Sequence, residues 1–243
     1  RGHFGSSSQP ARGCRRRRRR CRSAEMSAGF DAELLDALSG PGPAATDDER
    51  MGQMLDVLNG EGELIMKRTR ADVHRNGFWH RAVNIWIICP STTRLLMGQR
   101  AAGKDMDPHR WSCAAGRVPS GDLSMNTAIS RLAAEYSITA VADRQIGMAF
   151  SMRCPRTFTS GLFSGQQDAA WVDVYIATLD EELPLSRLHL DTRAKQAARY
   201  VSLAELRRAF EVRDEAYVIP PNDEYCKKLL HYLRKTCESA VPP

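Results

Sequence analysis

The 243-residue sequence contains no run of 18 apolar residues, so no transmembrane helix is expected. Its seven cysteines are an odd number and form no CxxC pair, which argues against both a zinc site and a disulfide framework. Free thiols are typical of reducing compartments, so an intracellular location is expected. The sequence shows no internal repeat. A membrane-spanning, zinc-ribbon or disulfide-rich protein is therefore not expected.

Acidic residues are almost absent from residues 1–25, which contain nine arginines and a single acid, Glu25. The formal net charge of the chain is +6, yet the residues after this arm carry 26 basic and 28 acidic side chains. An arm so poor in apolar residues is expected to be disordered. It has three interpretations: an organelle-targeting segment, for a mitochondrion or another organelle; an arm that binds RNA or an anionic surface; or a non-native leader before Met26.

The remaining sequence divides by composition. Residues 26–59 are predicted to hold short helices at 32–38 and 49–58 around a linker at 39–48, SGPGPAATDD. A folded domain is predicted over residues 60–237, followed by a tail at 238–243. A hydrophobic content of 42% is enough for a core. We therefore expect one main domain behind an arm and a linker.

Hydrophobic periodicity gives the elements of the main domain. Strands are predicted at 63–68, 81–89, 94–99, 148–153 and 171–178. Helices are predicted at 126–136, 203–210 and 223–235. Strands and helices without regular alternation indicate an α/β fold, namely an α/β/α sandwich around a mixed β-sheet.

Residues 116–138, GRVPSGDLSMNTAISRLAAEYSI, resemble a Nudix box. The pattern of that family is G-x5-E-x7-R-E-U-x-E-E-x-G-U, where U is a bulky apolar residue. Gly116 opens the segment and Ile138 closes it. Several polar positions differ from the pattern: Asp122, Ser130, Arg131, Ala134 and Ser137 replace Glu, Arg, Glu, Glu and Gly. Taken alone, the segment is also compatible with an ordinary amphipathic surface helix.

The resemblance extends over about residues 60–236, to the isopentenyl-diphosphate-isomerase-like branch of the Nudix superfamily, which includes plant and bacterial Nudix hydrolases. The matching residues are Arg70, Val73, His74, Arg75, Gly77, His80, Arg81, Ala82, Gln99, Arg100, Lys104, Pro108, Trp111, Ala114, Gly116, Asp173, Val174, Tyr175, Pro184, Leu185, Arg199, Tyr200, Val201, Val218, Ile219, Pro220 and Tyr225. Many short motifs in the right order make the resemblance specific. It implies a Nudix fold and, in active relatives, metal-dependent cleavage of a diphosphate.

Most of the carboxylates that such chemistry needs are absent. The family places glutamates at three positions on one helical face, which here are Arg131, Ala134 and Glu135. Mg²⁺ prefers carboxylate oxygens, and a guanidinium beside it is repulsive. Further acids of the family are missing around Ala170 and at Ala194. No metal cofactor is therefore expected, or Mg²⁺ or Mn²⁺ if hydrolase activity remains.

Several residues are still candidates for binding. Gly116, Arg100, Lys104 and Arg131 are candidates for contact with a phosphate group, although a solvated charged loop would explain the basic side chains equally well. Arg131 is alternatively an ion-pair partner of Glu135 one turn away.

Metal and catalytic candidates are weaker. Glu135 and Asp122 are the residual candidates for metal chemistry, with help from Asp107 or Asp173. His80 stands where isomerase relatives place a metal ligand, but a structural histidine is the more common case. Cys113 is expected to be a buried structural cysteine rather than an isomerase nucleophile.

Two functions remain open. The first is an inactive Nudix-fold protein retained as a binding or structural subunit of a larger assembly, organellar or ribonucleoprotein, with a phosphorylated ligand, other proteins or RNA as partners. The second is a metal-dependent hydrolase of a nucleoside or isoprenoid diphosphate. The first depends on the missing carboxylates, and the second on the rest of the resemblance. The compartment is expected to be an organelle if the arm targets one, and the cytoplasm otherwise.

Overall fold

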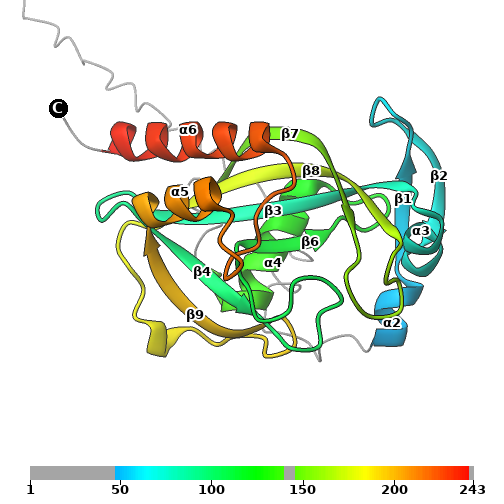
Figure 1. Cartoon of the computed structure of the whole chain (residues 1–243), viewed down its shortest axis with the longest axis horizontal. Helices are drawn as coiled ribbons and strands as arrows, with labels where there is room; N and C mark the ends of the chain where they lie inside the picture. Colours follow the sequence, from blue (N-terminus) through cyan, green and yellow to red (C-terminus); the bar gives the residue numbers. More distant parts are fainter. Residues whose placement is uncertain (1–46, 140–145, 241–243) are drawn as a thin grey trace, which may run out of the picture.

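The computed structural model describes residues 47–139 and 146–240, which form a mixed sheet with helices on both faces (Figure 1). The strands are β1 (Met54–Leu58), β2 (Leu64–Thr69), β3 (Trp79–Cys89), β4 (Arg94–Arg100), β5 (Trp111–Ser112), β6 (Ala114–Arg117), β7 (Ile146–Thr157), β8 (Gln167–Thr178) and β9 (Lys195–Ser202). The helices are α2 (Asp47–Gly52), α3 (Arg70–Asn76), α4 (Ser124–Tyr136), η2 (Leu185–Arg187), α5 (Leu203–Val212) and α6 (Asp223–Ala240). The predicted α/β/α sandwich is confirmed.

Strand β3 organises the sheet. One of its edges pairs in parallel with β8 from His80 to Ile88. Its other edge pairs in succession with β1, β6 and β4, all antiparallel. Strand β9 then continues from β4, and β7 continues from β8. Segments far apart in the sequence, notably the start of β9 and the end of β6, are thereby brought near the same helix, α4.

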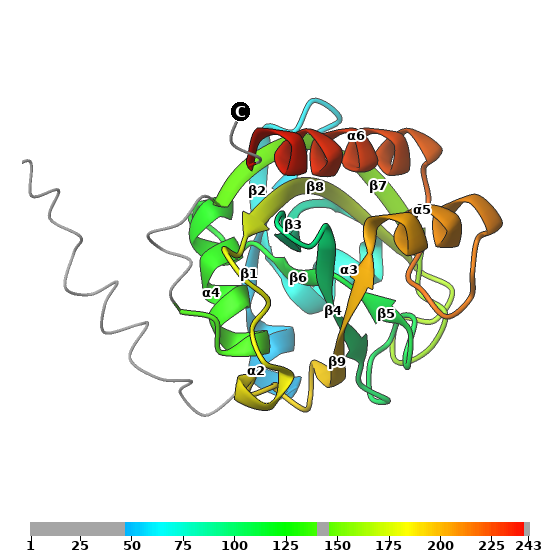
Figure 2. The same cartoon turned by 90° about the vertical axis from the view of Figure 1, so that its left-hand side faces the viewer.

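The alternation of side chains along β3 produces two cores. Trp86 and Ile88 face one side, where they pack with residues of α5 and α6 such as Leu206 and Leu229. Val83, Ile85 and Ile87 face the other side, where they pack with Leu132 and Tyr136 of α4. Figure 2 shows α6 above the sheet and α4 beside its other face. Of the helices in the described residues, none is both long and apolar enough to cross a membrane.

The predicted helix at 49–58 is wrong over its second half. Residues Met54–Leu58 form strand β1, which pairs with β2 and with the start of β3. The sequence MLDVL is too short for its periodicity to separate a strand from a helix, and the pairing decides. The sheet therefore begins before residue 60. The predicted helix at 32–38 and the arm lie outside the described residues.

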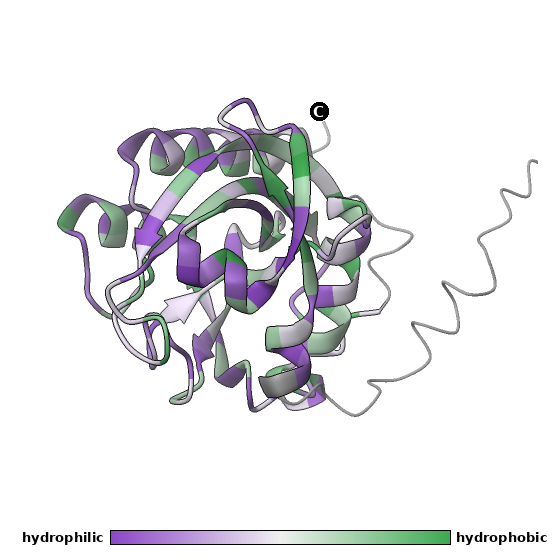
Figure 3. Ribbon diagram, turned by 90° about the vertical axis from the view of Figure 1, so that its right-hand side faces the viewer, coloured by the Kyte–Doolittle hydropathy of each residue, from purple (hydrophilic) through white to green (hydrophobic). Residues whose placement is uncertain are grey.

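Helix α3 carries a site residue into the core. Thr69 caps its first turn by accepting a hydrogen bond from the Asp72 amide, and Gly77 ends it with a left-handed φ of 63°. Figure 3 views this end of the molecule and shows hydrophilic and hydrophobic residues mixed along the ribbon. Val73 packs with Leu55 and Val57 of β1, and the next residue, His74, is buried against the rings of Phe158 and Phe163.

Candidate functional site

Helix α4 and the preceding strand β6 place the surviving Nudix carboxylate, Glu135, inside the protein. The side chain of Glu135 is 4% exposed, so it does not lie on an open metal-binding ridge. Its Oε1 accepts hydrogen bonds from Arg131 Nη2 at 2.6 Å and Nε at 3.2 Å. Its Oε2 lies 3.6 Å from Nζ of Lys195. The ion-pair alternative for Arg131 is thus the one that the structure shows.

Opposing influences act on the pKa of Glu135. Burial raises the pKa, but the positive charges of Arg131 and Lys195 outweigh it and hold the pKa below its usual value. Burial lowers the pKa of Lys195, and the charge of Glu135 opposes that shift. The site around Glu135 is therefore an ionised cluster in which cations occupy the surroundings of the carboxylate.

Gly116 serves the packing of Arg131. A Cβ at Gly116 would lie 2.8 Å from both Cγ and Cδ of Arg131, so the arginine stem covers the glycine. Nε of Arg131 also donates to the Ala115 carbonyl at 3.1 Å. The space that the sequence assigns to a phosphate at Gly116 is thus occupied by this side chain.

Arg100 and Lys104 lie close enough to Glu135 and Arg131 to interact electrostatically. The pKa of Lys104 is lowered to about 8, mainly by burial and also by the charges of Arg131 and Arg100, while Glu135 opposes the shift. Arg100 is half-buried and donates its Nε to the Met106 carbonyl at 2.8 Å. The charges of the predicted cationic loop therefore act on the surviving Nudix carboxylate, without a direct contact to it among the described residues.

The other predicted acids have different partners. Asp122 is exposed and binds the start of α4, accepting from the Leu123 amide at 2.8 Å and Thr127 Oγ1 at 3.0 Å. Asp107 pairs with Arg156 and with Arg110. Asp173 accepts from Arg81 and Ser151. These carboxylates are satisfied where they lie, and they do not converge with Glu135.

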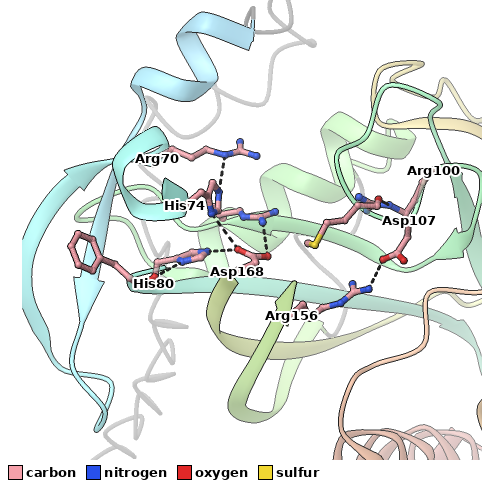
Figure 4. A network of polar contacts seen from close by, with 10 residues as sticks. Arg70, His74, His80, Arg100, Asp107, Arg156 and Asp168 are labelled. Carbon is pink, nitrogen blue, oxygen red and sulfur yellow. Dashed lines mark hydrogen bonds and ion pairs between the residues drawn. The ribbon is translucent and has the colours of Figure 1, made fainter. Parts of the chain in front are cut away.

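A second polar cluster lies at the start of β3 (Figure 4). Asp168 of β8 extends its Oδ1 to 3.3 Å from Nδ1 of His74 and to 3.4 Å from Nε2 of His80. Its Oδ2 accepts from Arg117 Nη2 at 2.7 Å. His74, His80 and Asp168 are the one group of three potential metal-ligating side chains among residues 47–139 and 146–240. Parallel pairing of β3 and β8 brings His80 and Asp168 together, and α3, which contacts β8, adds His74.

The electrostatics of this cluster differ from those around Glu135. Burial lowers the pKa of His80 to about 4, so the ring is neutral at pH 7. Burial would raise the pKa of Asp168, but Arg117 and both histidines outweigh it and keep the carboxyl ionised. The cluster therefore joins neutral imidazoles to a charged carboxylate.

A metal ion of the N/O-binding kind fits this second set of ligands. His80 Nδ1 lies 3.1 Å from the Phe78 carbonyl, which assigns the ring hydrogen to Nδ1 and leaves a lone pair on Nε2. That lone pair faces Asp168 Oδ1, and neither atom has a hydrogen-bond partner within the described residues. Nε2 of His74 accepts from Arg70 Nε at 3.4 Å, so this ring would have to release that contact and move its hydrogen before Nδ1 could bind a metal ion. Two imidazoles with one carboxylate would then suit Zn²⁺ or Mn²⁺ better than Mg²⁺. By contrast, the ligands around Glu135 do not fit a divalent ion.

A cavity of about 110 Å³ opens between these two clusters. Its lining is apolar toward Trp86, Val172 and Tyr225, while Arg100, Arg117 and Arg156 contribute guanidinium groups. Cys113 and Cys154 also line it, and burial raises the pKa of each thiol to about 12. The expectation of a buried, unreactive Cys113 is consistent with this.

Comparison with known proteins assigns the family. The NUDIX domain family model matches residues 78–220. The chain belongs to the Nudix family. Nudix hydrolase 3 of Arabidopsis thaliana is 32% identical over 187 residues, which are 75% of this chain and 23% of that protein. An uncharacterized Nudix hydrolase of Clostridium acetobutylicum is 28% identical over 99 residues, which are 40% of this chain and 48% of that protein.

A solved structure supports the Nudix fold. The Deinococcus radiodurans protein DR0079 superposes with a TM-score of 0.53 at 16% identity, over 75% of this chain and 98% of that one. Hydrolases of the Nudix family use divalent metals such as Mg²⁺ or Mn²⁺. This chain spans about a quarter of the Arabidopsis relative and about half of the Clostridium relative. The family and fold are therefore established, and the chemistry of this chain depends on its own residues.

Sequence reasoning missed Lys195, Asp168 and Arg117, and it gave His74 less weight as a ligand than His80. Lys195 directly follows Ala194, the position where an acid was expected. This adjacency to a site position could have marked Lys195 as a candidate site residue. His74 stands in the same motif as His80. Asp168 lies directly before Ala169 and Ala170, where an acid of the family is missing. Arg117 follows Gly116 without any distinctive pattern.

Proposed function

We propose that this protein binds a compound in which a diphosphate or phosphate is attached to a small apolar group. The cavity between the two clusters carries this proposal, since it combines an apolar lining with guanidinium groups. Arg100 makes no ion pair with any described residue, whereas Arg117 and Arg156 are paired with Asp168 and Asp107. Arg100 is thus the arginine of this cavity that is available to a phosphate.

The size of the cavity favours a small apolar group over a nucleoside. Cavities near 150 Å³ accept benzene, so about 110 Å³ suits roughly five carbon atoms. Burial of such a group contributes about 0.8 kcal/mol per CH₂. Of the two diphosphate classes expected from the sequence, an isoprenoid-type diphosphate therefore fits better than a nucleoside diphosphate.

Calorimetric titration tests this proposal with three probes: inorganic pyrophosphate, a five-carbon isoprenoid diphosphate and a nucleoside diphosphate. We expect the isoprenoid diphosphate to bind at least about ten-fold more tightly than the other two. Arg100→Met should weaken it at least about ten-fold. Arg187→Met removes the same charge from the exposed end of η2 and should have no effect. Equal affinity of wild type and Arg100→Met would refute the assignment.

A second candidate function is hydrolysis of the bound diphosphate. Two observations favour it: both relatives are named Nudix hydrolases, and the ligand set of His74, His80 and Asp168 fits a metal ion. These names support activity better than they support the inactive subunit expected from the missing carboxylates. A metal bound there would polarise a phosphate oxygen and acidify a water molecule.

Turnover measurements separate binding from hydrolysis. The same three compounds are incubated with Mg²⁺, Mn²⁺ or Zn²⁺, and phosphate release is measured. Hydrolysis at the second cluster predicts turnover that Asp168→Asn abolishes and Glu135→Gln retains. No turnover with any metal would leave binding alone as the function.

Membership of a larger assembly and RNA binding by the arm remain proposals. The arm lies outside the described residues, and its arginine run supports them. Affinity of the full chain for RNA is compared with that of residues 26–243 at several salt concentrations. A weaker salt dependence in the shorter chain is expected, and equal slopes would refute the role of the arginines.

A further inference from the structure

The ammonium of Lys195 is held by three oxygen atoms of different kinds. Nζ donates to Ser112 Oγ at 2.6 Å and to the Cys113 carbonyl at 2.8 Å. The carboxylate Oε2 of Glu135 lies 3.6 Å away. Hydroxyl, carbonyl and carboxylate oxygens are also the atoms that surround hard divalent cations in proteins. The Lys195 ammonium thus occupies an oxygen-lined position of the kind that binds a metal ion in other proteins.

The fold makes room for this lysine at one position. Lys195 begins β9, opposite Arg100 of β4, and its side chain is 3% exposed. A Cβ at Gly98 would lie 2.6 Å from Cδ of Lys195 and 2.5 Å from the hydroxyl of Tyr136. The absence of a side chain at Gly98 therefore allows the lysine stem to reach the carboxylate beneath α4.

Arg131 completes the neutralisation from the helix itself. It occupies the position of a family glutamate, and its guanidinium binds Oε1 of Glu135, while Lys195 approaches Oε2. Each oxygen of the one remaining carboxylate thus faces a cation. A divalent ion at this place would be repelled by two fixed charges within a few ångströms.

We propose that Lys195 and Arg131 take the electrostatic place of the divalent metal on this Nudix helix, so that α4 and its loop bind no metal ion. This inference concerns α4 alone and does not depend on the proposed ligand or on the cluster around Asp168. Arg131 and Ala134 replace two glutamates of the family, and the side-chain cations of Arg131 and Lys195 neutralise the one carboxylate that remains.

Titration with Mn²⁺, followed by the electron paramagnetic resonance signal of the free ion, tests the inference on the full chain. We expect wild type and Glu135→Gln to bind the same number of Mn²⁺ ions with affinities within two-fold, because Glu135 is not a ligand. A site present in wild type and lost in Glu135→Gln would overturn the inference.

A gain-of-binding variant gives the reciprocal test. Arg131→Glu, Ala134→Glu and Lys195→Met together remove both cations and restore two carboxylates on the helix. We expect one additional Mn²⁺ site that wild type lacks, and its loss when Glu135→Gln is added. A folded triple variant without the additional site would overturn the inference. If circular dichroism shows that the triple variant or Glu135→Gln is unfolded, wild type decides: stoichiometric Mn²⁺ that broadens the amide resonances of α4 more strongly than those around Asp168 would overturn the inference.

Discussion

The cluster around Glu135 and the cluster around Asp168 both bury a carboxylate beside an arginine, yet they suit different chemistry. At Glu135 the second partner is Lys195, a buried ammonium that also donates to Ser112 and to the Cys113 carbonyl. At Asp168 the other partners are two imidazoles, of which His80 is neutral at pH 7 and has an open nitrogen. Each carboxylate is thus paired with an arginine, and the two sites differ in the second partner, which is an ammonium at Glu135 and a pair of imidazoles at Asp168.

The largest expected effect comes from removing the charge of Glu135. Glu135→Gln leaves Lys195 and Arg131 buried without their anion, so we expect the free energy of unfolding to fall by about 3–5 kcal/mol. Urea denaturation measures this change.

An exposed pair offers a matched control for that measurement. Arg207 and Glu211 of α5 have the same i,i+4 spacing as Arg131 and Glu135, but their side chains are 59% and 62% exposed. Glu211→Gln should cost less than about 0.5 kcal/mol. Equal costs at the two positions would contradict the role assigned to burial.

The Asp168 cluster should instead be sensitive to mild acid. Burial lowers the folded-state pKa of His80 to about 4, whereas an unfolded histidine titrates near 6.5. Between these values the unfolded state binds more protons, so stability falls as pH falls from about 6.5 to 4. The loss from His80 is at most about 3 kcal/mol.

Denaturation at several pH values measures that window. His80→Gln should flatten the slope between pH 6.5 and 4, while His231→Gln, on the exposed side of α6, should retain it. Metal binding to wild type would also oppose protonation of His80. An unchanged slope in His80→Gln would show that another group is responsible.

The passage of Lys195 past Gly98 predicts an intermediate effect. Gly98→Ala would place a methyl group 2.6 Å from the lysine stem, and such overpacking costs about 1–3 kcal/mol. Gly103→Ala meets no atom within 4 Å and serves as the control. Thermal or urea denaturation compares the two. If Gly98→Ala is as stable as Gly103→Ala, the lysine does not follow the path described.

The fold could be predicted from the sequence because its signals are local or ordered along the chain. The apolar alternation of residues 81–89 predicts the central strand, and the loop-helix of residues 116–138 resembles a known box. Strand β1 was missed because five residues with one polar position suit either element until β2 pairs with them. Periodicity thus predicts the type of a long element, whereas strand pairing decides whether a short segment is a strand or a helix.

The site was predicted less well because its contacts join distant segments. Arg131 and Glu135 share one helix, so their ion pair was open to sequence reasoning. Lys195 reaches Glu135 only through the pairing of β9 with β4, and Asp168 reaches His80 only through the pairing of β8 with β3. The spacing of these residues along the sequence predicts neither contact. The missing acids were visible, but the cation that compensates for them was not.

The smallest expected effect concerns Lys104. Its pH dependence distinguishes a lysine that binds an anionic ligand from one held in a buried ion pair. Burial places the pKa of Lys104 at about 8, and among the described residues it makes no ion pair with a carboxylate. A bound phosphate would favour the charged ammonium, so the affinity for the isoprenoid diphosphate should fall several-fold as pH rises from 7 to 9. Lys104→Arg keeps its charge throughout this range and cancels the contribution of the ligand's own titration. If wild type and Lys104→Arg lose affinity equally, Lys104 does not contact the anion, and recognition depends on Arg100 instead.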